Sequence, residues 1–212
     1  MVRHMKILLF IFCVVLLSSY SYSEEISSGQ IVKTNGIVYE INPKSLQKFL
    51  FEETYTPFSG TVLYFHENGQ LQGRENYQDG VQDGLGEEFF ENGQLRVREN
   101  YKEDKLDGRV EWFYENGQID MIGNWRDGKE EGLFEWFWDD GKLRSKGNYK
   151  DGKKDGLWKE FWDNGQLMDK RNWKDGKPDG LWEDYYDNGQ LMSKQNYKDG
   201  KEDGLGVVYW GN

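Results

Sequence analysis

The chain has 212 residues, of which 16% are aromatic and 31% charged, and its formal net charge at pH 7 is −11. An acidic balance of this size disfavours nucleic acid and anionic lipid as bulk electrostatic partners. Because Cys13 is the single cysteine, the sequence excludes an intrachain disulfide and a site built on several thiolates.

Residues 1–23 have the pattern of a secretory signal peptide. Arg3 and Lys6 precede an apolar run at 7–17, and a serine-rich stretch follows before Glu24. The apolar run of 11 residues is shorter than the about 20 residues of a membrane span, so an uncleaved anchor is the less favoured alternative. Cleavage removes two positive charges and no carboxylate, which leaves Lys+Arg 25 against Asp+Glu 38 and a net charge of −13. We expect an exported protein of the periplasm, the cell surface or the extracellular space.

The segment 24–59 has its own pattern and is expected to form a small N-terminal cap. Between Ile31 and Tyr39 an Asn-Gly pair separates two apolar runs, which predicts a β-hairpin. From Pro43 to Glu53 the pattern predicts a short helix that begins with proline.

A tight-turn glycine then recurs every 24 residues, usually within the tetrapeptide Asp/Glu-Asn-Gly-Gln. The members of this series are Gly69, Gly93, Gly117, Gly141, Gly165 and Gly189. A second series runs from Gly60 to Gly204 and a third from Gly80 to Gly200, with Asp104 in place of one glycine. The sequence therefore predicts a repeat domain at 60–212, with six full units of 24 residues and a partial seventh from Gly204.

Each unit is predicted to be a β-hairpin, because Asn-Gly between aromatic and leucine-containing runs favours a two-residue type I′ turn. With Asn164-Gly165 as that turn, Trp162 faces Leu167, and Gly156 faces Trp173, whose indole covers the glycine backbone. The same register predicts the ionic pairs Glu87–Arg98, Glu135–Lys146 and Glu183–Lys194. Two pairs depart from it, Lys159 with Lys170 and Glu111 with Ile122.

The fold predicted for the whole repeat domain is all-β, an elongated antiparallel meander of hairpins that contact mainly their neighbours. The connections between hairpins are short and rich in Asp and Gly, and no unit has helical periodicity. A closed propeller is disfavoured, because a blade needs about 40 residues.

Alternation along the strands predicts one aromatic side of the sheet. Trp or Phe at the third and seventh positions, Leu at the twelfth and Tyr or Trp at the eighteenth share this side. Most of these rings are expected to form the core between hairpins, but a single layer leaves part of them exposed. The candidate interaction surface consists of Trp112, Trp136, Trp158 and Trp182. At the other end of the domain, Val207–Trp210 predicts an apolar edge strand suited to self-association or to pairing with the N-terminal cap.

The sequence predicts no catalytic residue, no metal site and no cofactor. Asp-Gly-rich connections such as 151–156 resemble calcium loops, but a lysine lies between the two aspartates and turn formation explains the same residues. Paired carboxylates such as Asp139-Asp140 recur along the chain, whereas acid–base catalysis needs one tuned pair. His66 is the single histidine after the leader, and no nucleotide-binding or nucleophile motif is present.

The repeated pattern Gly…Phe/Tyr…Asn-Gly-Gln-Leu…Asn-Tyr-Lys-Asp-Gly-Lys…Asp-Gly, over residues 57–212, resembles the variant MORN repeat of bacterial proteins of the YwqK antitoxin family. The resemblance implies stacked β-hairpins and a role as an interaction scaffold or membrane-associated module, without catalytic residues. We expect a secreted or envelope scaffold with a protein partner. The alternatives are a cell-surface carbohydrate-binding or lipid-associating module and an envelope antitoxin or immunity protein.

Overall fold

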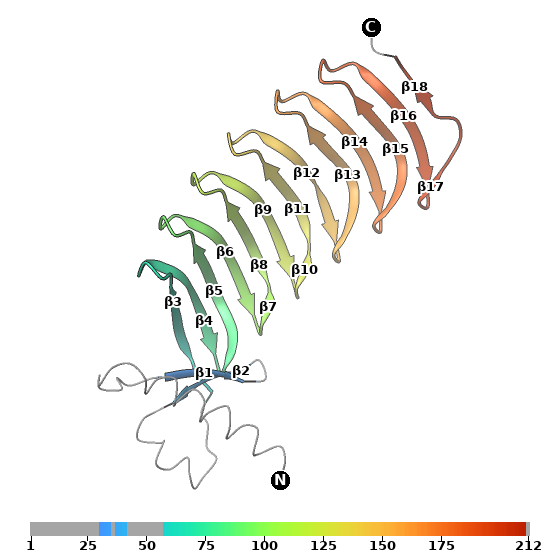
Figure 1. Cartoon of the computed structure of the whole chain (residues 1–212). Coiled ribbons are helices and arrows are strands. Elements are labelled where there is room, and N and C mark those ends of the chain that lie inside the picture. Colours follow the sequence, from blue (N-terminus) through green and yellow to red (C-terminus); the bar gives the residue numbers. More distant parts are fainter. Residues whose placement is uncertain (1–29, 35–36, 42–56, 211–212) are drawn as a thin grey trace, which may run out of the picture. The chain divides into compact units, whose positions relative to one another are not determined.

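The computed structural model describes the backbone of residues 30–34 and 37–41 and the whole of residues 57–210 (Figure 1). The leader at 1–23 and the short helix expected between Pro43 and Glu53 lie outside the described residues. Within the described ranges, no helix is long and apolar enough to cross a membrane.

Two strands precede the repeats. β1 (Gln30–Thr34) and β2 (Ile37–Ile41) form a two-stranded sheet of their own, at the place where the sequence predicts the hairpin of the N-terminal cap.

The repeats form one sheet of 16 strands, in which each long strand lies beside the next one along the chain, while the two-residue strands β7, β10 and β17 pair only with the strand before them (Figure 1). The strands are β3 (Gly60–Phe65), β4 (Leu71–Gln78), β5 (Val81–Phe89), β6 (Leu95–Lys102), β7 (Lys105–Leu106), β8 (Gly108–Phe113), β9 (Ile119–Arg126), β10 (Lys129–Glu130), β11 (Gly132–Phe137), β12 (Leu143–Lys150), β13 (Lys153–Phe161), β14 (Leu167–Lys174), β15 (Lys177–Tyr185), β16 (Leu191–Lys198), β17 (Lys201–Glu202) and β18 (Val207–Val208). Their order runs from β3 to β17 without closing. The antiparallel all-β meander predicted from the sequence is therefore confirmed.

The central register of the hairpins is the predicted one. Gly156 pairs with Trp173 and Lys159 with Lys170. The expected ionic partners also face one another, with Glu87 opposite Arg98, Glu135 opposite Lys146 and Glu183 opposite Lys194. Because the repeat has a fixed number of residues on each side of its turn, the register found in one unit recurs in the next.

The Asn-Gly turn differs from the prediction. In the fifth unit the loop has three residues, Asp163 to Gly165, because Trp162 N–H donates to the carbonyl of Gln166 at 2.8 Å and Gly165 N–H donates to the carbonyl of Trp162 at 2.8 Å. Only the glycine has positive φ, at 83°, as in a type I turn followed by a left-handed residue. The extra residue shifts the register near the loop, so Phe161 and not Trp162 faces Leu167.

The two-residue turn lies instead in the connection from one hairpin to the next, between β12 and β13 in this example. Asp151 and Gly152 have φ values of 50° and 78°, and the flanking residues Lys150 and Lys153 are paired. Positive φ at both central residues is the requirement of a type I′ turn, which Asp-Gly meets as well as Asn-Gly does. In the second unit, Glu103 and Asp104 take the same conformation without a glycine.

The loop asparagines connect each hairpin to the next. Asn164 Nδ2 donates to the carbonyl of Asp187, 23 residues further on, at 2.8 Å, while its Oδ1 accepts the N–H of Gln166 at 2.8 Å. Equivalent inter-unit bonds start from Asn68, Asn92 and Asn116. In the fourth unit Asp140 stands at this position, and its side chain has no N–H to donate. Lys142 Nζ donates instead to the carbonyl of Asp163 at 2.9 Å. The asparagine is therefore retained for its amide and not for its backbone conformation.

The seventh position of the unit provides a second link between neighbours. Tyr114 Oη donates to the carbonyl of Phe137 at 2.8 Å, and Trp162 Nε1 donates to that of Tyr185 at 3.3 Å. His66 occupies this position in the first unit, where its Nε2 lies 2.9 Å from the carbonyl oxygen of Phe89. The histidine that sequence analysis singled out thus makes the same contact as tyrosine and tryptophan in later units.

The core lies between units on one side of the sheet. Val110, Met121 and Phe134 are buried together, and Trp125 packs against them. Rings at the third position lie over the sixteenth residue of the preceding unit: Phe134 covers Gly123 and Trp158 covers Gly147.

The predicted cover of Gly156 by Trp173 within one hairpin is not found, since no atom lies within 4 Å of the site of a Cβ on Gly156. The aromatic cover therefore joins successive hairpins and does not stabilise a single one.

We predict that Gly147→Ala destabilises the protein by about 1–3 kcal/mol, because its methyl group would overlap the indole of Trp158 in a packed region. Chemical denaturation measures the change. Ser145→Ala, two residues earlier on the same strand, is the control and should change the unfolding free energy little. Equal midpoints for Gly147→Ala and the wild type would contradict the close packing of Trp158.

Candidate interaction surface

The aromatic face of the sheet carries a nearly continuous series of rings. Trp125 and Phe134 have centroids 4.8 Å apart, Phe134 and Trp136 5.8 Å, and Trp136 and Trp158 5.5 Å. A second group continues on the following strands, where Trp182 lies 5.2 Å from Trp173 and 4.5 Å from Tyr197. These rings pack against one another to different depths: Phe134 is buried, whereas Trp136 and Trp182 are half-buried.

The four candidate tryptophans share this face but differ in exposure. Trp112 is 42% exposed, and Trp158 is 4% exposed. Trp136 and Trp182 are half-buried. Trp158 is therefore mainly a core residue, whereas Trp112 offers the most accessible ring of the four.

Hydrogen bonds and cations hold the later indoles in place. Nε1 of Trp158 donates to the carbonyl of Asn148 at 3.0 Å, and Nε1 of Trp182 donates to that of Asn172 at 3.0 Å. The Lys154 ammonium lies 4.0 Å from the ring centroid of Trp158, within the range of a cation–π interaction. Such rings keep their orientation without a ligand, which lowers the entropic cost of binding.

A carboxylate that the sequence analysis did not single out interrupts this face. Asp169 is 3% exposed and faces Glu160 on one neighbouring strand and Asp184 on the other. Arg171 Nη2 lies 3.2 Å from its Oδ2, while Oδ1 has no hydrogen-bond partner among the residues that the structure describes. Burial, and then the neighbouring Glu160, raise the pKa of Asp169 to about 6. The sequence does carry a feature that could have identified Asp169: it stands at the fourteenth position of its unit, where other units have Gly, Val, Met or Ser.

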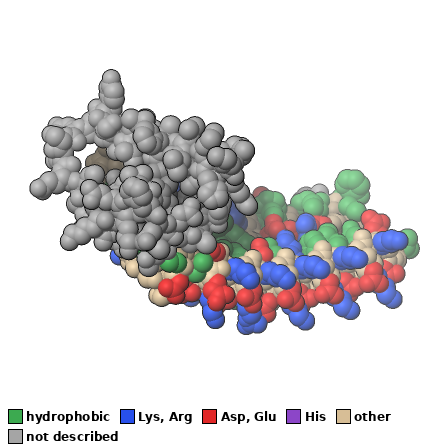
Figure 2. Space-filling view, turned by 90° about the horizontal axis from the view of Figure 1, so that it is seen from below, with side chains coloured by type: hydrophobic (Ala, Val, Ile, Leu, Met, Phe, Trp, Pro, Cys, Tyr) green, Lys and Arg blue, Asp and Glu red, His purple; other side chains and the backbone are tan. Residues whose placement is uncertain are grey.

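The connecting turns form an edge where both signs of charge alternate. Figure 2 shows rows of blue and red side chains along this edge, and exposed lysines at its turns include Lys129, Lys153 and Lys177. The aspartates of these connections bind backbone: Asp107 Oδ2 accepts the N–H of Asp127 at 3.2 Å. In residues 57–210, no three His, Cys, Asp or Glu side chains are grouped so as to hold a metal ion. Turn geometry thus accounts for the residues that resemble calcium loops.

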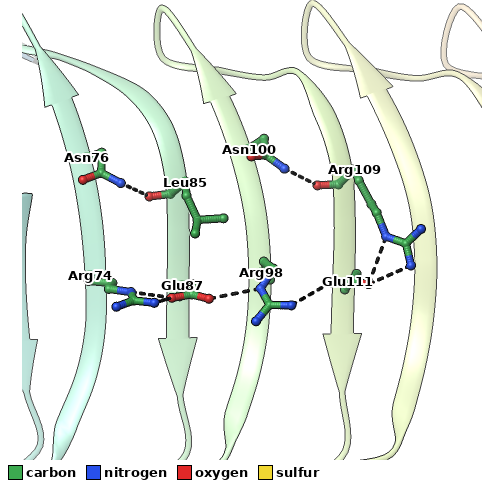
Figure 3. Close-up of polar contacts among 8 residues, drawn as sticks. All are labelled: Arg74, Asn76, Leu85, Glu87, Arg98, Asn100, Arg109 and Glu111. Carbon is green, nitrogen blue, oxygen red and sulfur yellow. Dashed lines mark hydrogen bonds and ion pairs between the residues drawn. The ribbon is translucent and has the colours of Figure 1, made fainter.

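The opposite, charged face carries a row of ion pairs across the strands. The carboxylate of Glu87 is buried between Arg74 and Arg98, and Arg98 also reaches Glu111, with Nη1 and Oε2 at 3.2 Å (Figure 3). Beside this row, Asn100 Nδ2 donates to the carbonyl of Arg109 at 2.9 Å. Ionic partners on both sides keep Glu87 paired despite its burial, because an isolated buried carboxylate is costly.

A polar hollow of about 460 Å³ lies over the first hairpins, with Tyr64, His66 and Glu75 among its lining residues. Glu75 in this lining is engaged within the protein: its Oε2 accepts hydrogen bonds from the hydroxyl of Tyr64 at 3.0 Å and from that of Tyr77 at 2.6 Å. Burial and the bond to Glu75 raise the pKa of Tyr77 above its ordinary value. These contacts order the side chains of the first hairpin.

We predict that Asp169 makes stability fall as pH rises from about 4 to 6. The folded state binds this proton more tightly than the unfolded state, where the pKa is near 3.8, so the full cost of about 1–3 kcal/mol is present above pH 6. Glu160 and Asp184 raise this cost, while Arg171 and Lys154 reduce it.

Asp169→Asn should flatten the pH dependence of the denaturation midpoint relative to the wild type. Asp163→Asn, a change in an exposed loop of the same unit, is the control. Parallel pH curves for the wild type and Asp169→Asn would show that Asp169 does not titrate in this window.

Comparison with solved structures gives weak likenesses. One is to the crystal structure of the S. aureus TarM G117R mutant in complex with fondaparinux, alpha-GlcNAc-glycerol and UDP, at 14% identity and a TM-score of 0.26, covering 76% of this chain and 23% of that one. Another is to the GtfA/B complex bound to UDP and GlcNAc, at 11% identity and a TM-score of 0.21, covering 70% and 24%. The chain thus spans about a quarter of each of these proteins, and similarity at this level carries no argument about function.

No curated protein matches the chain, so none supports the antitoxin resemblance. The pattern of the MORN repeat variant, in contrast, matches six times, once in each 24-residue unit. The matched residues are 58–79, 82–103, 106–127, 130–151, 154–175 and 178–199. These six matches place the chain in the MORN repeat variant family.

Proposed function

We propose that the protein is an exported, non-enzymatic scaffold that binds another protein across its aromatic face. MORN repeats are interaction modules for proteins or membranes. The observation that carries the proposal is the row of ordered, partly exposed rings from Trp112 to Tyr197 on one side of a single-layer sheet. Large aromatic side chains held in fixed orientations are the residues that contribute most to protein interfaces.

Charge on the aromatic face favours a protein over a lipid surface. Lys154 and Arg171 lie among the rings together with Glu160 and Asp184, so both signs occur within one patch. An anionic membrane would be repelled by these carboxylates and by the net charge of −11. A protein surface can complement a mosaic of both signs and apolar rings.

Export rests on the leader at 1–23, and the antitoxin resemblance is a special case of the same proposal. An immunity protein of the envelope would use this scaffold to hold a protein toxin. Such a role predicts a single, defined partner. A carbohydrate-binding module would instead show affinity for a polysaccharide without any protein.

We predict that Trp112→Ala reduces capture of the partner at least about fivefold, because a central aromatic contact contributes more than about 1 kcal/mol to an interface. The purified protein is used as bait in an envelope extract, and bound proteins are quantified by mass spectrometry. Leu63→Ala is the matched control, since Leu63 is 52% exposed but lies on the charged face of the first hairpin, opposite Arg74.

The same two variants are assayed on insoluble polysaccharides and on liposomes of mixed charge. Capture of one protein that is lost in Trp112→Ala and kept in Leu63→Ala supports the proposal. Equal capture by both variants, or binding confined to polysaccharide or liposomes, would reject it.

A further inference from the structure

The row of side chains that crosses the charged face changes character along the protein. In the first units its charges alternate in sign, with Glu87 between Arg74 and Arg98. On β12, β13 and β14 the row is instead Lys146, Lys159 and Lys170, each directly opposite the next. Like charges in this arrangement are destabilising. The pairs Lys146–Lys159 and Lys159–Lys170 therefore do not stabilise the sheet, whereas the arginine–glutamate pairs of the first units do.

Two of the three lysines have no acidic partner among residues 57–210. Lys170 forms an ion pair with Glu183. Neither Lys146 nor Lys159 forms one with any residue in the described range 57–210, although Glu135 stands opposite Lys146. A chain with a net charge of −11 thus keeps three adjacent cations on one face. Charge complementarity points to an acidic partner.

Exposed leucines lie beside the lysine row at a regular spacing. Leu133, Leu157 and Leu181 are 46%, 42% and 37% exposed and occupy the second position of three successive units. Each lies two residues before the fourth position, so alternation places it on the same face as Lys159. Two strands per unit set the leucines about 10 Å apart, and seven residues of an α-helix rise about 10.5 Å.

We propose that the charged face over β11–β15 is a second docking surface, specific for an acidic amphipathic helix of a partner protein. The helix lies across the strands, with apolar residues seven apart on the three leucines and carboxylates on the lysine row. Glu135 and Glu183 bound the row at its two ends. A long anionic polysaccharide or an anionic membrane would extend over these carboxylates and be repelled by them. A helix can place its own carboxylates over the three lysine-bearing strands alone. This surface lies opposite the aromatic face and is independent of it.

The test uses a synthetic 21-residue peptide with leucine at every seventh position and glutamates on both flanks, whose binding to the purified protein is measured by fluorescence anisotropy. Lys159→Glu is expected to weaken binding at least about tenfold. The same substitution should raise the Tm, because it recreates the alternation in which Glu87 lies between two arginines. Lys146→Gln, which removes a charge without adding one, should weaken binding in the same direction.

Two control variants separate the surface from bulk charge and from the aromatic face. Lys129→Glu makes the same charge change on the exposed edge and should leave the peptide Kd within about twofold. Trp112→Ala should bind the peptide as the wild type does, so loss of the aromatic-face interaction leaves this result unaffected.

Equal weakening by Lys129→Glu and Lys159→Glu would overturn the proposal, because only net charge would then matter. Unchanged affinity in both Lys159→Glu and Lys146→Gln would overturn it as well. So would binding of heparin or of phosphatidylglycerol vesicles that depends on Lys159 while the peptide does not bind, since the occupant would then be another kind of polyanion.

Discussion

Each hairpin of this protein is held by the next one, and this dependence determines the rest of the structure. A two-stranded hairpin has little apolar surface to bury alone. Here the loop amide, the seventh side chain and the third-position ring each reach into the adjacent unit, as Asn164, Trp162 and Trp158 do. Stability is therefore distributed along the array as contacts between neighbours. Where a unit lacks the loop asparagine, as at Asp140, another side chain makes the bond to the next unit, as Lys142 does.

The same dependence leaves two open faces with different chemistry. Rings that pack between units must lie on one side, so the aromatic face is at once the core and the largest apolar surface. The other side does not pack between units, and it carries charged side chains. These form ion pairs around Glu87, whereas Lys146 and Lys159 form none with the described residues. Residues that the stacking does not require are therefore the ones available for partners, and they differ from unit to unit.

Sequence reasoning succeeded where a single local rule acts and failed where two rules compete. The strand pairing Gly156–Trp173 and the row Glu87–Arg98 followed from counting residues across the repeat. The two-residue turn predicted at Asn164-Gly165 was wrong. Both Asn-Gly and Asp-Gly can take positive φ at their two residues, and the repeat period alone does not say which of the two dipeptides forms the two-residue turn. The exposures of Trp112 and Trp158 also could not be predicted, since Trp158 lies over Gly147 of the preceding unit, whereas Trp112, at the fifth position of its unit, faces Val97.

By itself the sequence determined the repeat length, the antiparallel order of the strands and the central register, since these depend on spacing along one chain. Only the tertiary structure decided how units are joined: that Trp158 covers Gly147 and not a glycine of its own hairpin, and that Asp169 is buried between Glu160 and Asp184. Contacts of this kind link residues about one repeat apart through space. They depend on the twist and offset of neighbouring hairpins, which the 24-residue period does not specify.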